Sequence, residues 1–519
     1  MTEEKHAVTT ANQNLAFTAP KFALDRPRTR MVVTIGPATR GLETIKDLMR
    51  RGVSVIRMNL SHGTRPDWDA DTRTIRQAAA DLNIAVGILA DLPGPKRRTG
   101  AVVGGGVNLV RDALLVLTSG NRHDGVMRIA INPGGLEHDV KPGALVWLDD
   151  GKIKLRVERI EGEDVVCRVA VGELLKGQKG VATPGSVSNL GYMTDETVEA
   201  LKFAAESDID FVGVSYCRSV ADLDLVRKAL RDQHHRADPP PALIAKIELG
   251  QAVDNLDAIV AALEANDGLM VARGDLGVEL PIELVPGAQK KIIQAANRAG
   301  KVVITATQML ESMTTNDLPL RAEVTDVYNA VLDGTDAVML SGETSIGKYP
   351  LETVEFMARI AKEAEKALDH DSLQQRRYAG MQSSGHTAMD EAIAHSAFSV
   401  AKTLQAKVIV AFTEGGSTAA RVASFRPRAL VLALVRHQYA ARRLSLRWGV
   451  MPIEVPPLRT IEVMFYEGSH AALLTGLAAH GDQVVVVMGV PIGFAGNTNL
   501  LRVMRLPEPR PTQAADVSA

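Results

Sequence analysis

Eight short apolar runs occur in the first two thirds of the chain, and they become polar at their carboxyl ends. Their length and their content of branched side chains are typical of buried β-strands. Because so many short strands must share one sheet, this pattern limits the possible folds more than any other feature of the sequence. The runs cover residues 31–36, 53–60, 85–91, 211–217, 242–248, 268–274, 302–307 and 337–341.

Segments with apolar positions three or four residues apart separate most of these runs and predict amphipathic helices. Gly300 and Gly334 suit the ends of two helices, because glycine readily takes a left-handed conformation. The repeated alternation of strand and helix predicts an α/β fold, a (β/α)8 TIM barrel with its active site at the carboxyl ends of the strands. The expected helices cover residues 42–51, 194–206, 221–230, 256–265, 289–298 and 321–332.

One connection, between the third and fourth strands, is far longer than a strand–helix unit needs. Within residues 101–184, glycine clusters separate alternating stretches such as 152–157 and 165–169, and residues 161–164 suit a hairpin turn. We therefore expect an inserted all-β domain at residues 99–186, placed at the active-site end and able to act as a lid. The barrel itself would occupy residues 23–98 and 187–368.

A third domain is predicted after the charged stretch 369–382, which has the character of a linker. Apolar runs at 406–412, 429–434 and 483–488 alternate with helical segments, so residues 383–507 should form a second, smaller α/β domain. Residues 1–22 and 508–519 lack periodicity, and we expect them to be disordered tails.

Composition excludes several classes of protein. A formal net charge of −2 gives no general attraction to nucleic acid or to a membrane surface. No run approaches the roughly 20 apolar residues of a membrane span, and the first residues lack the apolar core of a signal peptide. Cys167 and Cys217 have neither metal-site spacing nor a disulfide framework. The sequence therefore predicts a cytoplasmic protein with structural thiols.

Charged side chains at two strand ends form the strongest candidate site. Lys246 and Glu248 would point to the same side of a strand, because side chains alternate with a period of two. Arg273 and Asp275 repeat this spacing beside glycines that let the backbone approach a ligand. Two acids able to hold a hard cation, together with fixed positive charges, favour chemistry on a phosphate or an enolate.

Other runs end in polar side chains that the same alternation orients. Arg57, Asn59 and Ser61 lie at steps of two and would face one way. The third run ends at Asp91 and the seventh at Thr307. For the pair at the end of the eighth run we favour a structural role in stabilising the strand end; these residues are Ser341 and Glu343.

Six separate motifs resemble those of pyruvate kinases and occur in the same order. They are Thr-Ile-Gly-Pro-Ala at 34–38, Arg-Met-Asn-Leu-Ser-His-Gly at 57–63, Lys-Ile-Glu at 246–248, and residues 270–277, 306–313 and 339–344. Residues 148–153 are similar to the lid of that family and 489–499 to its carboxyl-terminal domain, so the resemblance covers roughly residues 28–507. It implies transfer of a phosphoryl group from phosphoenolpyruvate to ADP in glycolysis, giving pyruvate and ATP, by a cytoplasmic homotetramer.

The resemblance also implies roles for the charged residues. Lys246 and Arg57 would offset charge on the transferring phosphoryl group, and Lys246 would stabilise the enolate left behind. Glu248 and Asp275 would hold Mg²⁺ or Mn²⁺ between the substrate and the phosphoryl oxygens.

Backbone and hydroxyl groups would bind the rest of the substrate. N–H groups around Gly274 and Asp275 suit the carboxylate of phosphoenolpyruvate, since a helix can begin there. Thr307 would help to protonate the enolate through a water relay. By resemblance, the residues that line the ADP side are Pro37, Asn59, His62, Arg98 and Lys179.

Many pyruvate kinases need K⁺, and the residues of its site match Asn59, Ser61, Asp91 and the carbonyl of Leu92. Lys96 stands where the family usually has a glutamate beside this site. We expect the lysine ammonium to replace the free ion, so that K⁺ is not required, as in members of the family with lysine and leucine in this loop. The alternative is that Lys96 points to solvent and K⁺ still binds.

A loop in the third domain resembles the family's effector phosphate site. Its hydroxyls and glycine N–H groups precede a predicted helix and suit a phosphate; the candidate residues are Thr413, Gly415, Gly416, Ser417 and Thr418. Gly415 replaces a common serine and Glu414 adds a repulsive charge, which weighs against tight binding of a phosphorylated effector. A simple turn with a helix cap is the alternative.

Two other functional classes remain to be weighed. A metal-dependent aldolase that works through an enolate has no need of the lid, of Arg98 and Lys179, or of the third domain. A non-catalytic nucleotide-sensing protein would be expected to lose Lys246 or one of the metal acids. The sequence retains all of them.

Overall fold

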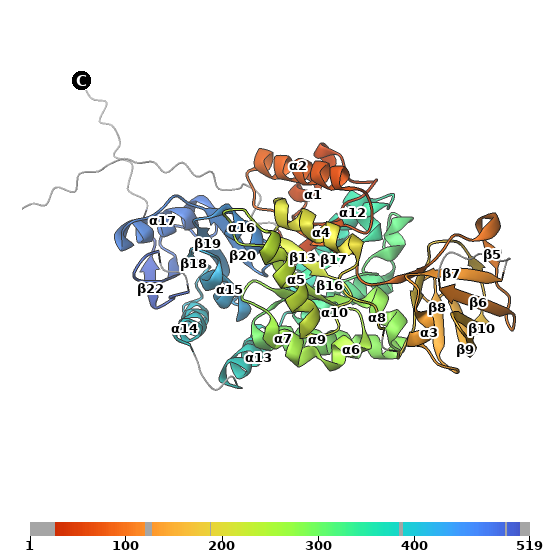
Figure 1. Cartoon of the computed structure of the whole chain (residues 1–519). Helices are drawn as coiled ribbons and strands as arrows, with labels where there is room; N and C mark the ends of the chain where they lie inside the picture. The colour runs from red at the N-terminus through yellow and green to blue at the C-terminus, as the bar shows by residue number, and fades with distance from the viewer. Residues whose placement is uncertain (1–25, 120–126, 187, 384–387, 494–495, 509–519) are drawn as a thin grey trace, which may run out of the picture.

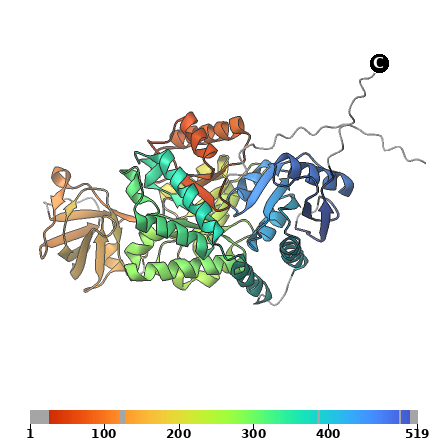
Figure 2. The ribbon, with the colours of Figure 1, turned by 180° about the vertical axis from the view of Figure 1, so that it is seen from behind.

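Three bodies follow one another along the molecule, with the inserted lid at one end, the barrel in the middle and the C-terminal domain at the other end (Figure 1, Figure 2). The computed structural model describes residues 26–119, 127–186, 188–383, 388–493 and 496–508. Apart from Glu508, both predicted disordered tails lie outside the described residues.

The middle body is a closed barrel of parallel strands in the order β1-β17-β16-β15-β14-β13-β3-β2, which confirms the predicted TIM barrel. Each strand falls within or beside one predicted run. Some of the polar residues end the strands, as Asp91 does, and others follow them, as Glu248 and Thr307 do. The bounds are β1 Arg30–Thr34, β2 Val53–Asn59, β3 Gly87–Asp91, β13 Phe211–Val214, β14 Ala242–Ile247, β15 Gly268–Ala272, β16 Val302–Ala306 and β17 Ala337–Leu340.

Helices surround this barrel. Gly300 and Gly334 end α9 and α10 with φ of 65° and 100°, as expected for left-handed caps. The helices are α1 Leu42–Arg50, α2 Arg65–Leu82, α4 Asp195–Glu206, α5 Val220–Gln233, α6 Gly250–Asp254, α7 Leu256–Ala262, α8 Arg273–Glu279, α9 Val285–Ala299, α10 Arg321–Asp333, α11 Gly342–Ser345 and α12 Pro350–Lys366, with 3-10 turns at Ile282–Leu284 and Glu311–Thr314.

Two layers of apolar side chains hold the barrel together. Val32, Val55 and Ile304 belong to the cluster that fills its interior. Val33 and Ile56, one position further along their strands, belong to the layer between the sheet and the helices. This alternation fixes which polar residues face the mouth of the barrel when the strands end.

The sequence analysis assigned no helix to residues 65–82, where the structure has α2. Charged residues dominate this helix, and only a narrow stripe that includes Trp68 and Ile75 is buried. A start signal was present, since the Thr64 N–H donates to Asp67 Oδ2 at 2.8 Å and Pro66 follows the cap.

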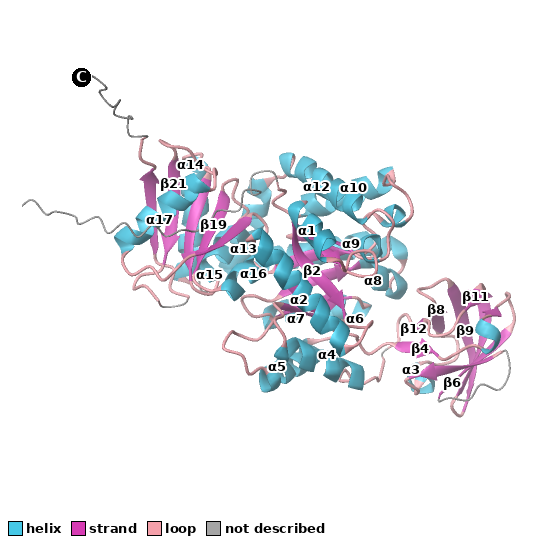
Figure 3. Cartoon of the chain, turned by 90° about the horizontal axis from the view of Figure 1, so that it is seen from above, coloured by secondary structure: helices cyan, strands magenta, loops and turns pink. Residues whose placement is uncertain are grey.

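The inserted domain is a second closed barrel in the order β10-β6-β7-β4-β12-β8-β9, set apart from the main barrel (Figure 3). Its β9–β10 hairpin turns at Gly162, as predicted. It is not purely β, because it includes the one-turn helix α3 Leu136–Asp139 and a 3-10 turn at Val103–Gly105. The strands are β4 Arg97–Thr99, β5 Val107–Asn108, β6 Leu114–Ser119, β7 Arg128–Asn132, β8 Leu145–Leu148, β9 Ile153–Glu161, β10 Asp164–Val171, β11 Leu174–Leu175 and β12 Gly180–Ala182.

The C-terminal domain contains a five-stranded sheet in the order β20-β19-β18-β21-β22. The prediction found three of these strands and missed the edge strands β20 and β22, of which β22 is antiparallel to β21. The elements are β18 Val408–Thr413, β19 Leu430–Val435, β20 Val450–Glu454, β21 Gln483–Met488 and β22 Leu500–Arg505, with helices α14 Met389–Thr403, α15 Ser417–Ser424, α16 Gln438–Leu444 and α17 Ile461–Leu474.

The predicted linker at 369–382 is wrong, because most of it forms helix α13, His370–Ser383. Few of its residues are apolar, so periodicity gave no helical signal. Contacts with distant segments stabilise it instead: Arg377 is buried, donates from Nε to Ser424 Oγ at 3.0 Å and pairs with Glu391. Among the described helices, none combines the length and the apolar character that crossing a bilayer requires.

Arginines of the C-terminal domain reach aspartates at the amino ends of the barrel strands. Arg442 lies with Nε 2.8 Å from Asp210 Oδ1 and with Nη2 2.7 Å from Asp208 Oδ1. Arg426 Nη1 lies 2.9 Å from Asp336 Oδ1. These buried and partly buried ion pairs fasten the C-terminal domain to the end of the barrel opposite the polar strand ends.

Candidate active site

Lys246 is the centre of a buried group of charges at the carboxyl end of the barrel. Its Nζ lies 2.9 Å from Glu248 Oε1 and 3.1 Å from Asp91 Oδ1, and it donates to Ser215 Oγ at 2.7 Å. All three charged side chains are buried. The period-two argument that placed Lys246 and Glu248 on one side of β14 is confirmed.

Arg57 shares Asp91 with Lys246. Its Nε donates to Asp91 Oδ2 at 2.7 Å and its Nη1 donates to Thr34 Oγ1 at 3.0 Å. Burial alone would raise the pKa of Asp91, but the Lys246 ammonium and the Arg57 guanidinium bring it below its ordinary value. Burial likewise opposes the charge of Lys246, whose pKa is nevertheless raised by Asp91 and Glu248. The cluster therefore holds the charged Arg57 and Lys246 side chains beside the Asp91 carboxylate.

The two predicted metal acids lie near each other although they follow different strands, Glu248 after β14 and Asp275 after β15. Burial raises the pKa of Glu248 to about 7 against the effect of Lys246, and the Asp275 carboxylate adds to the rise. Desolvation would also raise the pKa of Asp275, but Lys96 and the Tyr216 hydroxyl bring it below its ordinary value. A divalent cation between these acids would favour the charged form of both.

The donor set fits a hard cation such as Mg²⁺. In the described residues, no group of three or more histidine, cysteine or acidic side chains is arranged to hold a metal. Mg²⁺ commonly rests on one or two carboxylates, and substrate phosphates and waters complete its shell. Asp275 Oδ2 accepts no hydrogen bond within the described part of the chain, which leaves it free for a ligand.

Gly274 and Thr307 meet beside Asp275. Helix α8 begins at Arg273, and the Gly274 N–H donates to Thr307 Oγ1 at 2.7 Å. Thr307 has a φ of 67° and Gln308 one of 52°, a left-handed backbone that few residues other than glycine adopt. Such conformations concentrate at functional sites, where surrounding contacts hold them.

Arg273 does not face the site, which corrects the expectation from its spacing. It lies at the start of a helix rather than in a strand, so its side chain does not point the same way as Asp275. Its Nη2 donates to Thr307 O at 2.7 Å and its Nη1 lies 2.6 Å from Asp326 Oδ2. Arg273 therefore fixes the backbone of Thr307.

Lys96 points at Asp275 rather than at the residues of the predicted K⁺ site. Its Nζ lies 2.9 Å from Asp275 Oδ1 and 3.8 Å from Asp150 Oδ1 of the lid, so it does not extend freely into solvent. In the predicted K⁺ site, Asn59 Oδ1 accepts the Ser61 N–H at 3.2 Å, and both Asp91 oxygens contact cations. Leu92 is buried and donates its N–H to Gly213 O.

The predicted ADP-side residues lie on two bodies. Pro37, Asn59 and His62 belong to the barrel, whereas Arg98 is in β4 and Lys179 directly precedes β12 of the lid. Lys179 Nζ lies 2.8 Å from Asp149 Oδ1, and Arg98 is exposed. No hydrogen bond or ion pair joins the two sets in the described residues, so the lid and the barrel each carry part of this group.

Sequence reasoning missed Ser215 and Tyr216, which follow β13. Ser215 Oγ accepts from Lys246 and donates to Asp91 Oδ1 at 3.1 Å. Tyr216 contacts Glu248 and Asp275. Both residues stand at the carboxyl end of a predicted strand run, which was the signal that could have found them.

Glu343 has the structural role that we favoured. It is buried, its Oε1 accepts the Leu310 N–H at 3.1 Å, and its Oε2 accepts the Ser341 N–H at 2.7 Å. Both carboxylate oxygens are thus used to hold the loops after β16 and β17.

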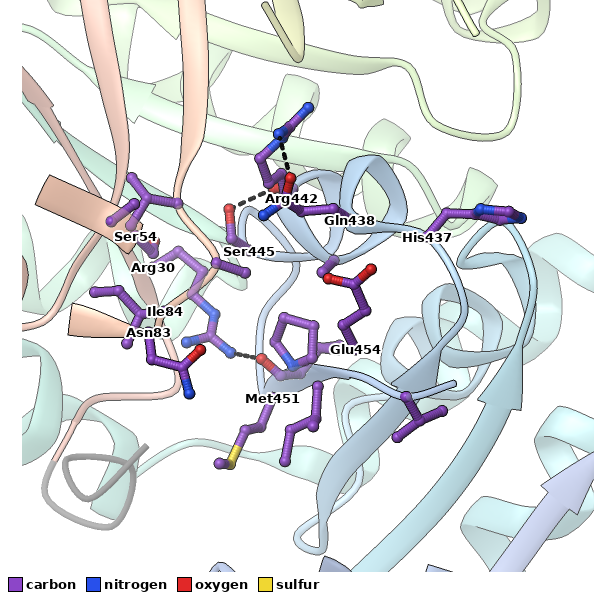
Figure 4. Close-up of a pocket in the computed structure, with 18 of the residues that line it drawn as sticks. Arg30, Ser54, Asn83, Ile84, His437, Gln438, Arg442, Ser445, Met451 and Glu454 are labelled. Atoms are coloured by element: carbon purple, nitrogen blue, oxygen red, sulfur yellow. Dashed lines mark hydrogen bonds between the residues drawn. The ribbon is translucent and has the colours of Figure 1, made fainter. Parts of the chain in front are cut away.

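Two cavities border the barrel at opposite ends. A cavity of about 410 Å³ lies between lid and barrel, and Lys96, Trp147, Tyr216 and Asp275 are among its lining residues. A larger one of about 920 Å³ lies between the other end of the barrel and the C-terminal domain (Figure 4); its walls include Arg30, Ser54, Asn83, Arg442 and Glu454. The larger cavity includes none of the predicted catalytic residues, so its size does not mark the chemistry.

The loop of the predicted effector site uses its polar groups internally. Thr413 Oγ1 accepts the Gly416 N–H at 3.0 Å, and the hydroxyls of Thr418 and Thr498 lie 2.7 Å apart. Glu414 Oε2 lies 3.7 Å from Arg436 Nη1. Helix α15 begins at Ser417, and no side chain caps its amino end. The geometry therefore agrees with the simple turn, but not with the side-chain helix cap that was expected with it.

Family models for the pyruvate kinase barrel domain and for the pyruvate kinase alpha/beta domain match residues 26–354 and 391–504. The chain belongs to the pyruvate kinase family. A pyruvate kinase of Bacillus licheniformis is 40% identical over 478 residues, which are 92% of this chain and 80% of the relative. Another, of Agrobacterium vitis, is 40% identical over 483 residues, 93% of this chain and 99% of the relative. A crystal structure of a pyruvate kinase from Cryptosporidium parvum matches with a TM-score of 0.87 at 34% identity, covering 93% of this chain and 97% of that one.

Members of the pyruvate kinase family are phosphotransferases, and this family uses phosphoenolpyruvate and ADP with a divalent metal. Membership therefore favours the kinase interpretation over a metal-dependent aldolase or a nucleotide sensor.

Proposed function

We propose that this chain is a pyruvate kinase whose active site is the cluster around Lys246. It transfers the phosphoryl group of phosphoenolpyruvate to ADP and releases pyruvate and ATP. The observation that carries the proposal is the buried Lys246 ammonium, held charged between Asp91 and Glu248 at the mouth of the barrel. A fixed positive charge in a site of low polarity is what a transferring phosphoryl group needs.

Phosphoryl transfer depends mainly on positioning and on neutralising charge. Arg57 on β2 and Lys246 on β14 offset the negative charge of the phosphoryl oxygens. After transfer, Lys246 remains beside the enolate oxygen and stabilises it. Asp91 contributes by holding both cations at fixed positions, with contacts of 2.7 Å to Arg57 and 3.1 Å to Lys246.

Glu248 and Asp275 would hold Mg²⁺ or Mn²⁺, which would neutralise negative charge on the transferring phosphoryl group. The N–H groups of Gly274 and Asp275 bind the substrate carboxylate at the start of α8. Thr307 delivers a proton to the enolate through a water, and its hydroxyl is oriented by Ala306 O. The Gly274 N–H, which donates to Thr307 Oγ1 in the substrate-free chain, would turn to the substrate carboxylate.

ADP binds between barrel and lid, and the residues that contact it are Pro37, Asn59, His62, Arg98 and Lys179. We further propose that K⁺ is not required, because Lys96 already supplies a fixed ammonium in the active site, where it pairs with Asp275 rather than with the residues of the predicted K⁺ site. A homotetramer and a phosphorylated effector at residues 413–418 follow the family pattern.

The direct test is a coupled assay of pyruvate formation from phosphoenolpyruvate and ADP, with and without Mg²⁺. We expect pyruvate only when all three are present. Pyruvate formation that persists when ADP is omitted would contradict phosphoryl transfer, as would inactivity of the folded chain in the complete mixture.

A further inference from the structure

Tyr216 contacts both of the proposed metal acids. Its backbone N–H donates to Glu248 Oε2, and its hydroxyl donates to Asp275 Oδ1 at 2.6 Å. Glu248 directly follows β14 and Asp275 follows β15, whereas Tyr216 comes from the loop after β13. In the described part of the chain, no other residue forms hydrogen bonds with both carboxylates.

The backbone of Tyr216 is strained in the conformation that allows these two contacts. Its φ of 54° lies in the left-handed region, where a bulky side chain is a genuine outlier. Strain of this kind persists only when surrounding contacts over-determine it. Here the Lys96 ammonium lies 5.5 Å from the centre of the Tyr216 ring, and Lys96 pairs with the same Asp275.

The hydrogen bonds divide the carboxylate oxygens in a definite way. Asp275 Oδ1 accepts from the Tyr216 hydroxyl and contacts Lys96, while Oδ2 accepts no hydrogen bond from any described residue. On Glu248, Oε2 accepts from Tyr216 and Oε1 contacts Lys246. Partners behind metal ligands commonly set the orientation of those ligands and strengthen metal binding.

We propose that Tyr216 is a positioning residue that sets the spacing of Glu248 and Asp275 and turns Asp275 Oδ2 toward a divalent cation. The hydroxyl fixes one acid and the backbone N–H of the same residue fixes the other. Their separation is therefore preset before the cation arrives. This inference rests on the proposed role of both acids as metal ligands.

The Tyr216→Phe variant tests this role because it keeps the ring and the backbone and removes only the hydroxyl. We expect the dissociation constant of Mn²⁺ to rise about tenfold, as is usual when a partner behind a metal ligand is lost. The measurement is the electron paramagnetic resonance signal of free Mn²⁺ titrated with the substrate-free protein. Turnover should recover as the Mn²⁺ concentration is raised, because the lost hydrogen bond acts through the metal acids.

Tyr192→Phe is the matched control. Its buried hydroxyl donates to Ser215 O at 2.9 Å, so the change removes one hydrogen bond from the same loop without touching either acid. We expect Mn²⁺ affinity to stay within about twofold, since the carboxylate contacts remain. Thermal unfolding of both variants confirms that they are folded.

Two results would overturn the inference. One is an unchanged Mn²⁺ affinity in Tyr216→Phe, and the other is equal weakening in Tyr192→Phe, which would assign the effect to the loop rather than to the acids. Glu248→Gln separates this failure from failure of the proposed function. If Glu248→Gln weakens Mn²⁺ binding and Tyr216→Phe does not, only the role of Tyr216 is wrong; if neither does, the metal role of Glu248 is wrong.

Discussion

The two ends of the main barrel bury the same kinds of charge, but their carboxylates differ in how fully they are paired. At the amino end, Asp210 Oδ2 accepts from Ile88 N at 2.8 Å and Arg76 Nη2 at 2.6 Å, and Oδ1 accepts from Arg442. At the carboxyl end, Asp275 receives both of its donors on Oδ1. The open Oδ2 lets Asp275 accept a ligand without losing a contact, whereas Asp210 would first have to give up a hydrogen bond.

Asp336, at the start of β17, repeats the amino-end pattern. Its Oδ1 accepts from Arg426 at 2.9 Å and its Oδ2 accepts the Val303 N–H at 3.1 Å. Burial and ion pairing therefore do not distinguish a functional carboxylate from a structural one in this molecule. The open oxygen separates Asp275 from Asp210 and Asp336.

The largest effect that the comparison predicts is on stability at the amino end. Arg442→Met removes the partner of two aspartates and leaves buried Asp210 with one cation fewer, which should cost about 3 to 5 kcal/mol of unfolding free energy. Denaturant unfolding measures this, and turnover per folded molecule should be unchanged. Arg436→Met is the control, because its exposed side chain should contribute no more than about 0.5 kcal/mol. If Arg442→Met lost turnover but kept its stability, the carboxylates at the amino end would not be purely structural.

At the carboxyl end, the corresponding charge deletion should act on catalysis. Lys246→Met keeps the length of the stem and removes the ammonium, so turnover should fall by roughly 100-fold or more. The KM for phosphoenolpyruvate should change less, because other groups still bind the substrate. Initial rates of pyruvate formation measure both. A variant that retains most of its turnover would remove Lys246 from the chemistry.

Loss of one metal ligand should have an intermediate effect. Glu248→Gln replaces an anionic oxygen with a neutral one, and the Mg²⁺ concentration for half-maximal activity should rise by about tenfold. The measurement is a Mg²⁺ titration of turnover at fixed substrate concentrations. If the titration curve does not move, Glu248 has a structural role like that of Asp210 and is not a metal ligand.

A smaller effect concerns pH at the amino end. Burial, together with Arg428, Arg28 and Arg426, lowers the pKa of His370 below its ordinary value, although its hydrogen bond to Arg426 O opposes this. The unfolded chain then binds the proton more readily, so stability is full above about pH 6.5 and falls as the pH drops through the folded pKa. Between pH 7.5 and pH 5.5, the unfolding midpoint should fall less in His370→Gln than in the unmodified chain. Equal losses would contradict the assignment.

The smallest expected effect is that of K⁺. Since Lys96 already places an ammonium beside Asp275, replacing tetramethylammonium by K⁺ at fixed ionic strength should change turnover less than about twofold. Lys96→Glu should become activated by K⁺. Strong activation of the unmodified protein would show that an ion still binds at Asn59, Ser61 and Asp91.

Period-two alternation predicted the parts of the site that lie on strands. It placed Lys246 beside Glu248 and brought Arg57 and Asp91 to the mouth of the barrel, because parallel strands end at one edge. It failed at Arg273, where the chain passes from strand to helix within the motif and the side-chain period changes.

The remaining features depend on contacts between distant segments. The position of Tyr216 follows from a left-handed backbone that residue type does not encode, and the acids that it contacts follow later in the chain. Helix α13 depends on Arg377 reaching Glu391 and Ser424. Local periodicity contains no information about such partners.

The lid enters and leaves the barrel through one pair of hydrogen-bonded strands, since β4 and β12 are antiparallel with Arg98 opposite Gly180 and Arg97 opposite Val181. A body attached by two adjacent strands has few degrees of freedom: it can swing about that pair, but it cannot slide along the mouth of the barrel. Lys96 immediately precedes this pivot and contacts Asp275. A rotation of the lid about this pair of strands would therefore change the position of the Lys96 ammonium relative to Asp275.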